Sequence, residues 1–348
     1  MAGPDRQILI VTPTFHPERV GTPHYATDLA LALTDAGFDV GVVTNQPYYP
    51  EFRRFDGYGR ARRHDQLGPV WVHRLPTVVP RGGRPGWRAT SEANMLAQGL
   101  ARKLLGQLPE AAAVIAISPG APFAALIGRA LRRADGHLLT VVHDVQAGLI
   151  GATSRGLAAR ANRAAGVVEA WALNQSDVVA PLSAPMGDAL TQLGVQVPIR
   201  PVPLWATVPA QVRPLSAEAA RTVVYSGSVG RKQGVGILVE LAGVLAGTHP
   251  RARVVIRGDG SEKPTLVSTV AARGLRNVVF EPLVPVEQLV DALGNAAVHL
   301  VPQLPEGALA AVPSKVFNVL AVGRPVVATA HPGTPLALLA EETPAVRV

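Results

Sequence analysis

Short apolar runs alternate with helical stretches along the first half of the chain. The runs lie at 8–12, 40–44, 70–75, 113–118, 137–144 and 177–183. Unbroken apolar runs of this length are typical of parallel strands that are covered on both faces. Between them apolar residues recur with the period of a helix, as at Tyr25, Leu29 and Leu33. A strand followed by a helix, repeated, predicts a doubly wound α/β sheet.

A proline-rich stretch interrupts this pattern. Residues 197–215 contain five prolines and show neither a helical nor a strand period. The alternation then resumes, with apolar runs at 222–227, 253–258, 277–283, 297–303 and 324–330. We therefore predict two Rossmann-like α/β domains, at 1–200 and 214–348, joined by a linker at 201–213.

The composition agrees with a folded protein that has a large core. The chain has 348 residues, of which 48% are hydrophobic and 17% charged. It contains no cysteine, which excludes disulfides, thiolate metal sites and a cysteine nucleophile. No apolar run reaches membrane-spanning length and no signal peptide is visible, so we expect a cytoplasmic protein.

Positive charge is concentrated in one segment. The net charge is +8, and nine arginines lie between Arg53 and Arg88 against only Asp56 and Asp65. With the aromatic residues among them, these arginines suit an anionic lipid surface, a phosphate-bearing acceptor or nucleic acid. A solvated arginine-rich loop is the alternative. No recognition helix or RNA-binding motif is legible, so we expect no nucleic-acid partner and favour peripheral contact with an anionic membrane through 52–88.

One glycine-rich turn suggests phosphate binding. A predicted strand leads into GSVGRKQG at 227–234, and a helical stretch follows. Glycines let the backbone approach a ligand, and the two cations Arg231 and Lys232 suit a diphosphate. The segment lacks the GxxxxGK[ST] and GxGxxG patterns, which speaks against a P-loop and against dinucleotide binding. An ordinary strand-to-helix turn is the alternative.

Two more segments place polar residues at the carboxyl ends of predicted strands, where open α/β sheets bind ligands. The segment RGDG carries Asp259 and Gly260. The segment at 301–330 contains a loop, a proline and a short helix. Its candidate site residues are Glu306, Ser314, Lys315 and Asn318. Common turns and ordinary helix caps would produce the same residues.

The first half offers two candidate segments of the same kind. The loop after the first strand contains Gly21, which would let a backbone amide approach a phosphate or sugar, followed by Thr22. His143 and Asp144 end the strand at 137–144, where an imidazole can hydrogen-bond a sugar hydroxyl. A structural histidine is the alternative. The sequence has no HExxH, GxSxG or DxD pattern, so we expect no metal.

Taken in order, these segments resemble the retaining GT-B glycosyltransferases of family four. The closest resemblance is to the branch that builds bacterial surface polysaccharides, of the colanic-acid and L-fucosamine transferase type. The matching segments are TPTFHPERVGTPHYATDLALAL, TVVHDVQAG, YSGSVGRKQG, IRGDG and VPSKVFNVLAVGRPVVAT. They span nearly the whole chain, and the last is the most specific.

The resemblance implies two Rossmann-like domains that face a cleft. The C-terminal domain would hold a nucleotide sugar and the N-terminal domain the acceptor. The glycine-rich turn at 227–234 would hold the pyrophosphate through Gly227, Ser228, Gly230 and Gln233. Arg231, Lys232 and His143 would be the catalytic residues. Gly21 and Thr22 would touch the phosphate or the sugar, and Asp259, Gly260 and Leu283 would border the base and ribose.

The chain departs from the family pattern in three places. Ser228 and Gln233 stand where the wider family has an arginine and a lysine. The family's pair of glutamates, eight positions apart, is replaced by Ala310 and Asn318, and Glu306 lies upstream. Family members also continue beyond the position of Val348, so we expect the last elements of the second domain to be missing.

The sequence thus predicts a metal-independent hexosyltransferase without a cofactor. It would move a sugar from a UDP- or GDP-sugar to a lipid-linked or glycan acceptor in polysaccharide or glycoconjugate biosynthesis. Two alternatives stay open. A sugar-nucleotide 2-epimerase on the same scaffold would need acids poised for proton abstraction, with Glu18, Asp144 and Glu306 as candidates. A catalytically weak nucleotide-sugar-binding subunit would bind a nucleotide without turnover.

Overall fold

The chain forms two compact units, which are described separately. In the computed structural model, Met1–Pro203 make up unit 1 and Leu204–Val348 make up unit 2. The division falls inside the proline-rich stretch. The structure describes residues 6–19, 21–59, 64–80, 85–118, 123–145, 157–230, 233–304, 308 and 312–348.

The described residues of unit 1 form a seven-stranded sheet of order β3-β4-β2-β1-β5-β6-β7. All neighbours pair in parallel except β3 and β4, which are antiparallel. The strands are β1 (Gln7–Val11), β2 (Asp39–Asn45), β3 (His64–Leu67), β4 (Val70–Leu75), β5 (Ala111–Ser118), β6 (Arg132–Val142) and β7 (Val178–Pro181). The chain reverses direction along the sheet after β4, and this makes the sheet doubly wound.

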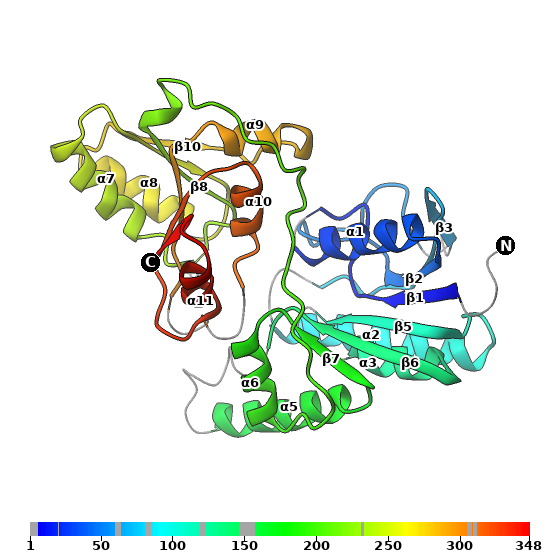
Figure 1. The fold of residues 1–348 in the computed structure, drawn as a ribbon. Helices are drawn as coiled ribbons and strands as arrows, with labels where there is room; N and C mark the ends of the chain where they lie inside the picture. The colour runs from blue at the N-terminus through cyan, green and yellow to red at the C-terminus, as the bar shows by residue number, and fades with distance from the viewer. Residues whose placement is uncertain are drawn as a thin grey trace. The chain divides into compact units, whose positions relative to one another are not determined.

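Helices cover both faces of this sheet (Figure 1). Helix α1 (Thr22–Asp35) packs on the face that contains Ile10, while α2 (Pro85–Leu104) and α3 (Phe123–Leu131) pack on the face that contains Leu9. Successive residues of β1 therefore enter different cores, which is why this strand is apolar without interruption. Helix α5 (Leu157–Leu173) precedes β7, and α6 (Ala184–Leu193) follows it.

Unit 2 repeats the plan with a six-stranded parallel sheet of order β10-β9-β8-β11-β12-β13. Its strands are β8 (Thr222–Ser226), β9 (Arg253–Arg257), β10 (Val278–Glu281), β11 (Val298–Val301), β12 (Val326–Ala328) and β13 (Val346–Arg347). Its helices are α7 (Ile237–Thr248), α8 (Lys263–Ala272), α9 (Leu289–Gly294), α10 (Lys315–Ala321) and α11 (Pro335–Glu342). Helices α7 and α8 share one core cluster, and α9, α10 and α11 share another.

The predicted class, two doubly wound α/β domains, is confirmed. Each of the eleven predicted apolar runs contains a strand, but β3 and β13 were missed. Strand β3 has the sequence HDQL, in which Leu67 is the only apolar residue. It lies at the edge of the sheet and is partly exposed, so it can pair with β4 without an apolar pattern of its own. Strand β13 is only two residues long. Both elements depend on a neighbouring strand rather than on a pattern of their own.

The stretch predicted as a linker is partly fixed to unit 2. The backbone N–H of Gln211 donates to the Ala321 carbonyl (2.9 Å), and the Arg324 guanidinium donates to the Arg213 carbonyl (2.7 Å). Val212 packs against Gly323, where a Cβ would meet its side chain at 2.7 Å. These contacts tie residues 211–213 to the end of α10. Among the described residues, no helix has both the length and the apolar character needed to cross a membrane.

Candidate functional site

Two glycine turns lie side by side at the carboxyl edge of the unit 2 sheet. The turn Gly227–Gly230 follows β8, and the turn Gly258–Gly260 follows β9. The backbone N–H of Val229 donates to the carbonyl of Asp259 (2.8 Å), which joins the two turns. The two turns, which are separate candidate segments in the sequence, therefore form one site, at the edge where parallel α/β sheets bind ligands.

The second turn requires glycine at two positions. Gly258 has φ +149°, and a Cβ there would lie 1.9 Å from the carbonyl oxygen of Gly227. Gly260 has φ +154°, and a Cβ there would lie 2.3 Å from the carbonyl oxygen of Val229. Because the backbones touch, no larger residue fits without moving the first turn. The glycines thus fix the shape of the two joined turns, Gly227–Gly230 and Gly258–Gly260, which together we call the cradle.

Lys315 extends its ammonium group to this cradle. It is the first residue of α10, and its Nζ lies 4.1 Å from the centroid of the Tyr225 ring. The same Nζ is 2.6 Å from where a Cβ on Gly227 would be, so the absence of a side chain makes room for it. Burial lowers the pKa of Lys315 to about 8. No carboxylate of the described residues is in an ion pair with it, so its charge is available to an anion.

Tyr225 positions both the lysine and the turn. Its ring is fully buried, and its hydroxyl donates to the carbonyl of Ser228. Burial raises the pKa of this phenol, so it stays neutral and its ring face attracts the Lys315 ammonium. Sequence reasoning missed Tyr225, because an aromatic residue inside a strand looks like an ordinary core residue. Its place just before the glycine turn was the available signal.

Asn318 is bonded to the segment that leads into unit 2. Its Oδ1 accepts from the backbone N–H of Thr207 (2.7 Å), and its Nδ2 donates to the Thr207 hydroxyl (3.0 Å). Asn318 is one of the site residues predicted from the sequence, whereas Thr207 was not foreseen. In this structure the amide is already paired with Thr207.

The other predicted residues of unit 2 vary in their surroundings. Ser314 occupies the N-cap position of α10, but its side chain caps no backbone N–H. The N–H of Gln233 donates to the Gly230 carbonyl (3.2 Å), and the side chain of Leu283 is 53% exposed just after β10. Ser228 and Asp259 are exposed on the two turns. Arg231, Lys232 and Glu306 lie outside the described residues.

In unit 1 the structure brings three predicted residues together. Gly21 is the N-cap of α1 with φ +79°, and nothing lies within 4 Å of where its Cβ would be. The hydroxyl of Thr22, the next residue, is 3.4 Å from Nδ1 of His143. The His143 ring packs edge-on against Tyr25, with the centroids 5.8 Å apart. These residues meet at the carboxyl ends of β1 and β6.

His143 is a neutral imidazole in this setting. Burial lowers its pKa to about 4, so near pH 7 it carries no charge. A neutral ring has one donor and one acceptor nitrogen, which suits a hydrogen bond to a sugar hydroxyl and excludes the role of a fixed cation.

Glu18 shapes the loop before α1. It is 3% exposed and accepts hydrogen bonds from the backbone N–H groups of Tyr48 (2.9 Å), Tyr49 (2.8 Å) and Phe15 (3.1 Å). Burial raises its pKa to about 7, against the opposing effect of these three bonds and of Arg74. The oxygens of the Glu18 carboxyl group are therefore already hydrogen-bonded to the backbone, so this group is poorly placed to abstract a proton from a substrate.

The described arginines of the basic stretch are engaged within unit 1. Arg74 is 2% exposed, and it donates to Asp65 (3.0 Å) and to the His16 carbonyl (2.6 Å). Arg53 pairs with Asp56, and Arg54 donates to the Thr77 carbonyl (3.3 Å). The remaining six arginines are Arg60, Arg62, Arg63, Arg81, Arg84 and Arg88, and the structure does not describe their side chains.

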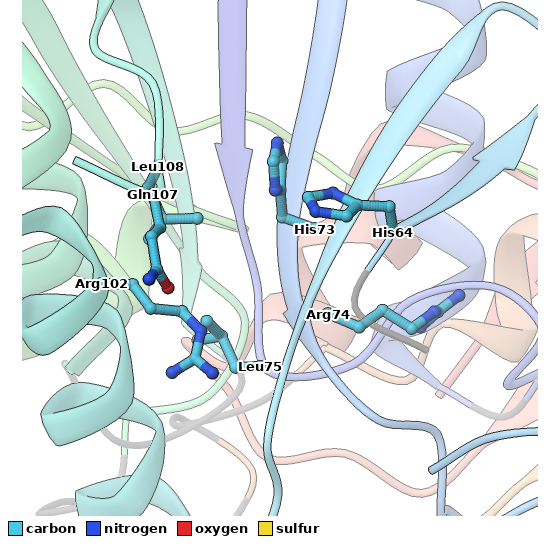
Figure 2. Close-up of a pocket in the computed structure, with 7 residues that line it drawn as sticks. All are labelled: His64, His73, Arg74, Leu75, Arg102, Gln107 and Leu108. Carbon is cyan, nitrogen blue, oxygen red and sulfur yellow. The ribbon is translucent and has the colours of Figure 1, made fainter. Parts of the chain in front are cut away.

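Unit 1 also contains a cavity of about 300 Å³ near the β3 edge of its sheet. Its lining residues are His64, His73, Arg74, Leu75, Arg102, Gln107 and Leu108. Figure 2 shows the rings of His64 and His73 in contact on one side, with Arg102 and Gln107 opposite and the Arg74 side chain turned away. Burial and the adjacent His64 lower the pKa of His73 to about 4. None of the predicted site residues lines this cavity.

Among the described residues, no three histidine or acidic side chains gather as metal ligands would.

A glycine cradle beside a lysine that no described carboxylate pairs with, on a doubly wound sheet, is typical of a domain that binds a phosphorylated ligand. The comparison with known families agrees. Residues 20–205 match the family described as "Glycosyl transferase 4-like domain", and residues 220–346 match "Glycosyl transferases group 1". The first match spans more than half of the chain, so the chain belongs to the glycosyl transferase 4-like family.

A relative in Escherichia coli K12 carries the name "Putative colanic acid biosynthesis glycosyl transferase WcaI". It is 28% identical over 365 residues, covering 98% of this chain and 88% of the relative. The predicted resemblance to family-four glycosyltransferases is thereby confirmed.

Solved structures show the same fold at low sequence identity. The sucrose-phosphate synthase of Thermosynechococcus elongatus superimposes with a TM-score of 0.70 and 19% identity, covering 98% of this chain and 85% of that one. Anabaena HepE, solved in complex with UDP and glucose, gives a TM-score of 0.60 and 16% identity, covering 92% and 80%. These likenesses support the GT-B fold.

Proposed function

We propose that this glycosyltransferase moves a hexosyl group from a UDP- or GDP-sugar to a lipid-linked or glycan acceptor in the biosynthesis of a polysaccharide or glycoconjugate. The observation that carries the proposal is the cradle of unit 2, where two glycine turns lie beside the Lys315 ammonium. The name of the E. coli relative supports a polysaccharide pathway, and the UDP and glucose bound to HepE support this kind of donor.

The donor's diphosphate would bind at the cradle. Lys315 would neutralise one phosphate oxygen from α10, and the glycine turn would bring backbone amides close to the others. Arg231 and Lys232 follow the turn in the sequence and remain predicted contributors of charge. Positive charge fixed before the reaction stabilises the diphosphate as it leaves, which lowers the barrier to breaking the bond between sugar and phosphate.

The transfer would proceed with retention of configuration and without a metal or other cofactor. The bond between the anomeric carbon and the phosphate oxygen breaks, and the acceptor oxygen bonds to that carbon on the face the phosphate vacates. The acceptor's proton passes to the departing phosphate. His143, neutral and hydrogen-bonded by Thr22, would orient a sugar hydroxyl rather than stabilise charge. Asp259, Gly260 and Leu283 would border the nucleoside. Peripheral membrane contact through 52–88 stays a prediction.

A catalytically weak binding subunit is the second candidate, and one observation favours it. Asn318 stands where the family has a glutamate, and here its amide is paired with Thr207. Such a site would hold a nucleotide less firmly. No observation favours the epimerase, since Glu18 is enclosed by three backbone donors.

A thermal-unfolding panel with UDP, GDP, dTDP, ADP and inorganic phosphate tests the proposal. A diphosphonucleoside at ~100 times its dissociation constant should stabilise the chain by about 2.7 kcal/mol. The shift should disappear in Lys315→Met and persist in Lys103→Met, a lysine of unit 1 paired with Glu110. Equal shifts in both variants would contradict the site. A shift without sugar transfer from the matching nucleotide sugar would favour the binding subunit.

A further inference from the structure

Helix α5 of unit 1 presents an apolar stripe to solvent. Val167 is 68% exposed, Val168 47% and Trp171 54%. Arg160, Arg163 and Ala164 are also exposed on this helix. The spacing of these residues, three or four apart, places them on one face. Large exposed side chains gathered in this way differ from the scattered exposed hydrophobics of an ordinary surface.

The opposite face of α5 attaches the helix to the unit. Ala170, Ala172 and Leu173 are buried, and so is Glu169, at 4% exposure. Glu169 is the only acidic residue of the helix. The exposed stripe therefore combines valines, a tryptophan and two arginines with no negative charge. Within the described part of unit 1, it is this buried face that packs α5 against the rest of the unit.

We propose that this stripe docks unit 1 on the surface of a bilayer that contains anionic lipid. Tryptophan prefers the boundary between headgroups and acyl chains, and the two valines would enter the apolar side of that boundary. Arg160 and Arg163 lie about three and about two turns before Trp171 and would meet anionic headgroups. The chain's net charge of +8 also favours binding to anionic lipid.

A lipid surface fits the stripe better than a second protein does. Stable protein interfaces bury about 800 Å² on each partner and need complementary polar groups at the rim. This stripe is one helix face with cations as its only charged groups. A bilayer satisfies it without shape complementarity, because headgroups and acyl chains rearrange around it.

The inference deepens the proposed function, since a lipid-linked acceptor would be found at the same surface. It does not depend on transfer, because membrane binding needs neither donor nor acceptor. It also differs from the contact predicted for 52–88, whose described arginines are engaged within unit 1. In Figure 1, α5 lies with α6 at the β7 side of the sheet, away from the β3 edge.

Vesicle co-sedimentation of the full-length chain tests the proposal. We expect binding to vesicles of phosphatidylcholine with phosphatidylglycerol, and much weaker binding to phosphatidylcholine alone. The double variant Arg160→Gln, Arg163→Gln should lose about fivefold in affinity per arginine. The double variant Val167→Ser, Trp171→Ser should lose at least about tenfold, because each removed side chain would have been buried in the boundary.

Matched controls come from exposed residues of unit 2. The pair Arg251→Gln, Arg276→Gln changes net charge equally, and Val244→Ser removes a valine that is 60% exposed on α7. Both should bind as the unaltered chain does. The proposal is overturned if the stripe variants bind like these controls, if the unaltered chain ignores anionic vesicles, or if it is a dimer in solution that Trp171→Ser dissociates.

Discussion

The ammonium group of Lys315 is buried, and no acidic side chain of the described residues forms an ion pair with it. Most buried ammonium groups are paired with a carboxylate, whereas this one lies over a tyrosine ring and beside a glycine. An ion pair would make the charge unavailable, and the ring leaves it free to meet an anion. Burial without an ion pair also explains why the pKa falls to about 8 from the ordinary value of 10.5.

This pKa gives donor binding a predictable pH dependence. Lys315 is charged below about pH 8 and loses its proton above, so its attraction for a diphosphate is complete at pH 7. Titration calorimetry with the stabilising diphosphonucleoside should show constant affinity from pH 6.5 to 7.5 and a fall of up to about tenfold per pH unit above 8. Lys315→Arg, which stays charged throughout, should remove that fall. An identical pH profile in this variant would assign the titration to another group.

Gly258 allows a second prediction for a single residue. Gly258→Ala places a Cβ 1.9 Å from the Gly227 carbonyl oxygen at a φ of +149°, so the two turns must separate. Overpacking alone costs roughly 1–3 kcal/mol, and the strained φ adds to it. Gly243→Ala is the control, because nothing lies within 4 Å of that Cβ on α7. Urea unfolding should show destabilisation in the first variant and a small gain in the second.

At the scale of elements, α10 joins the cradle to the segment that enters unit 2. Asn318 of this helix bonds Thr207, while Lys315, one turn earlier, meets the cradle. Asn318→Ala would leave the half-buried backbone N–H of Thr207 without its acceptor and should destabilise the chain by about 1 kcal/mol. Asn318→Asp keeps the acceptor oxygen and should cost less. Urea unfolding of the two variants checks this order, and equal losses would mean that the hydrogen bond to Thr207 contributes little.

The sequence predicted elements better than contacts. The apolar runs at 222–227 and 253–258 located β8 and β9, because a strand covered on both faces has an unmistakable composition. The glycine turns after them were also found. The pairing of Asn318 with Thr207 was not, since 111 residues separate them and neither has a local signature. Tyr225 was missed for a related reason: its role depends on Lys315, which only the folded sheet brings near.

At the scale of the molecule, the two units contain different kinds of polar group at their candidate sites. The contacts that shape the cradle join residues of unit 2 to one another, from the glycine turns to α10 and Thr207. The residues around His143 belong to unit 1, where burial has made the imidazole neutral. The charged group proposed to bind the diphosphate and the neutral imidazole proposed to bind a hydroxyl thus belong to separate sheets, and each can be examined by itself in the intact chain.

Hydrogen exchange of the full-length chain should reveal this division. A bound diphosphonucleoside orders only the backbone that it contacts, so protection should rise in peptides covering 223–230, 253–262 and 312–323. Peptides covering β3 and β4 of unit 1, at 64–75, serve as the internal control and should exchange as before. Gly258→Ala should remove the ligand's effect even where the chain remains folded, because it separates the two turns. Protection confined to unit 1 would place the nucleotide on the other sheet and would leave the Lys315 ammonium without the proposed ligand.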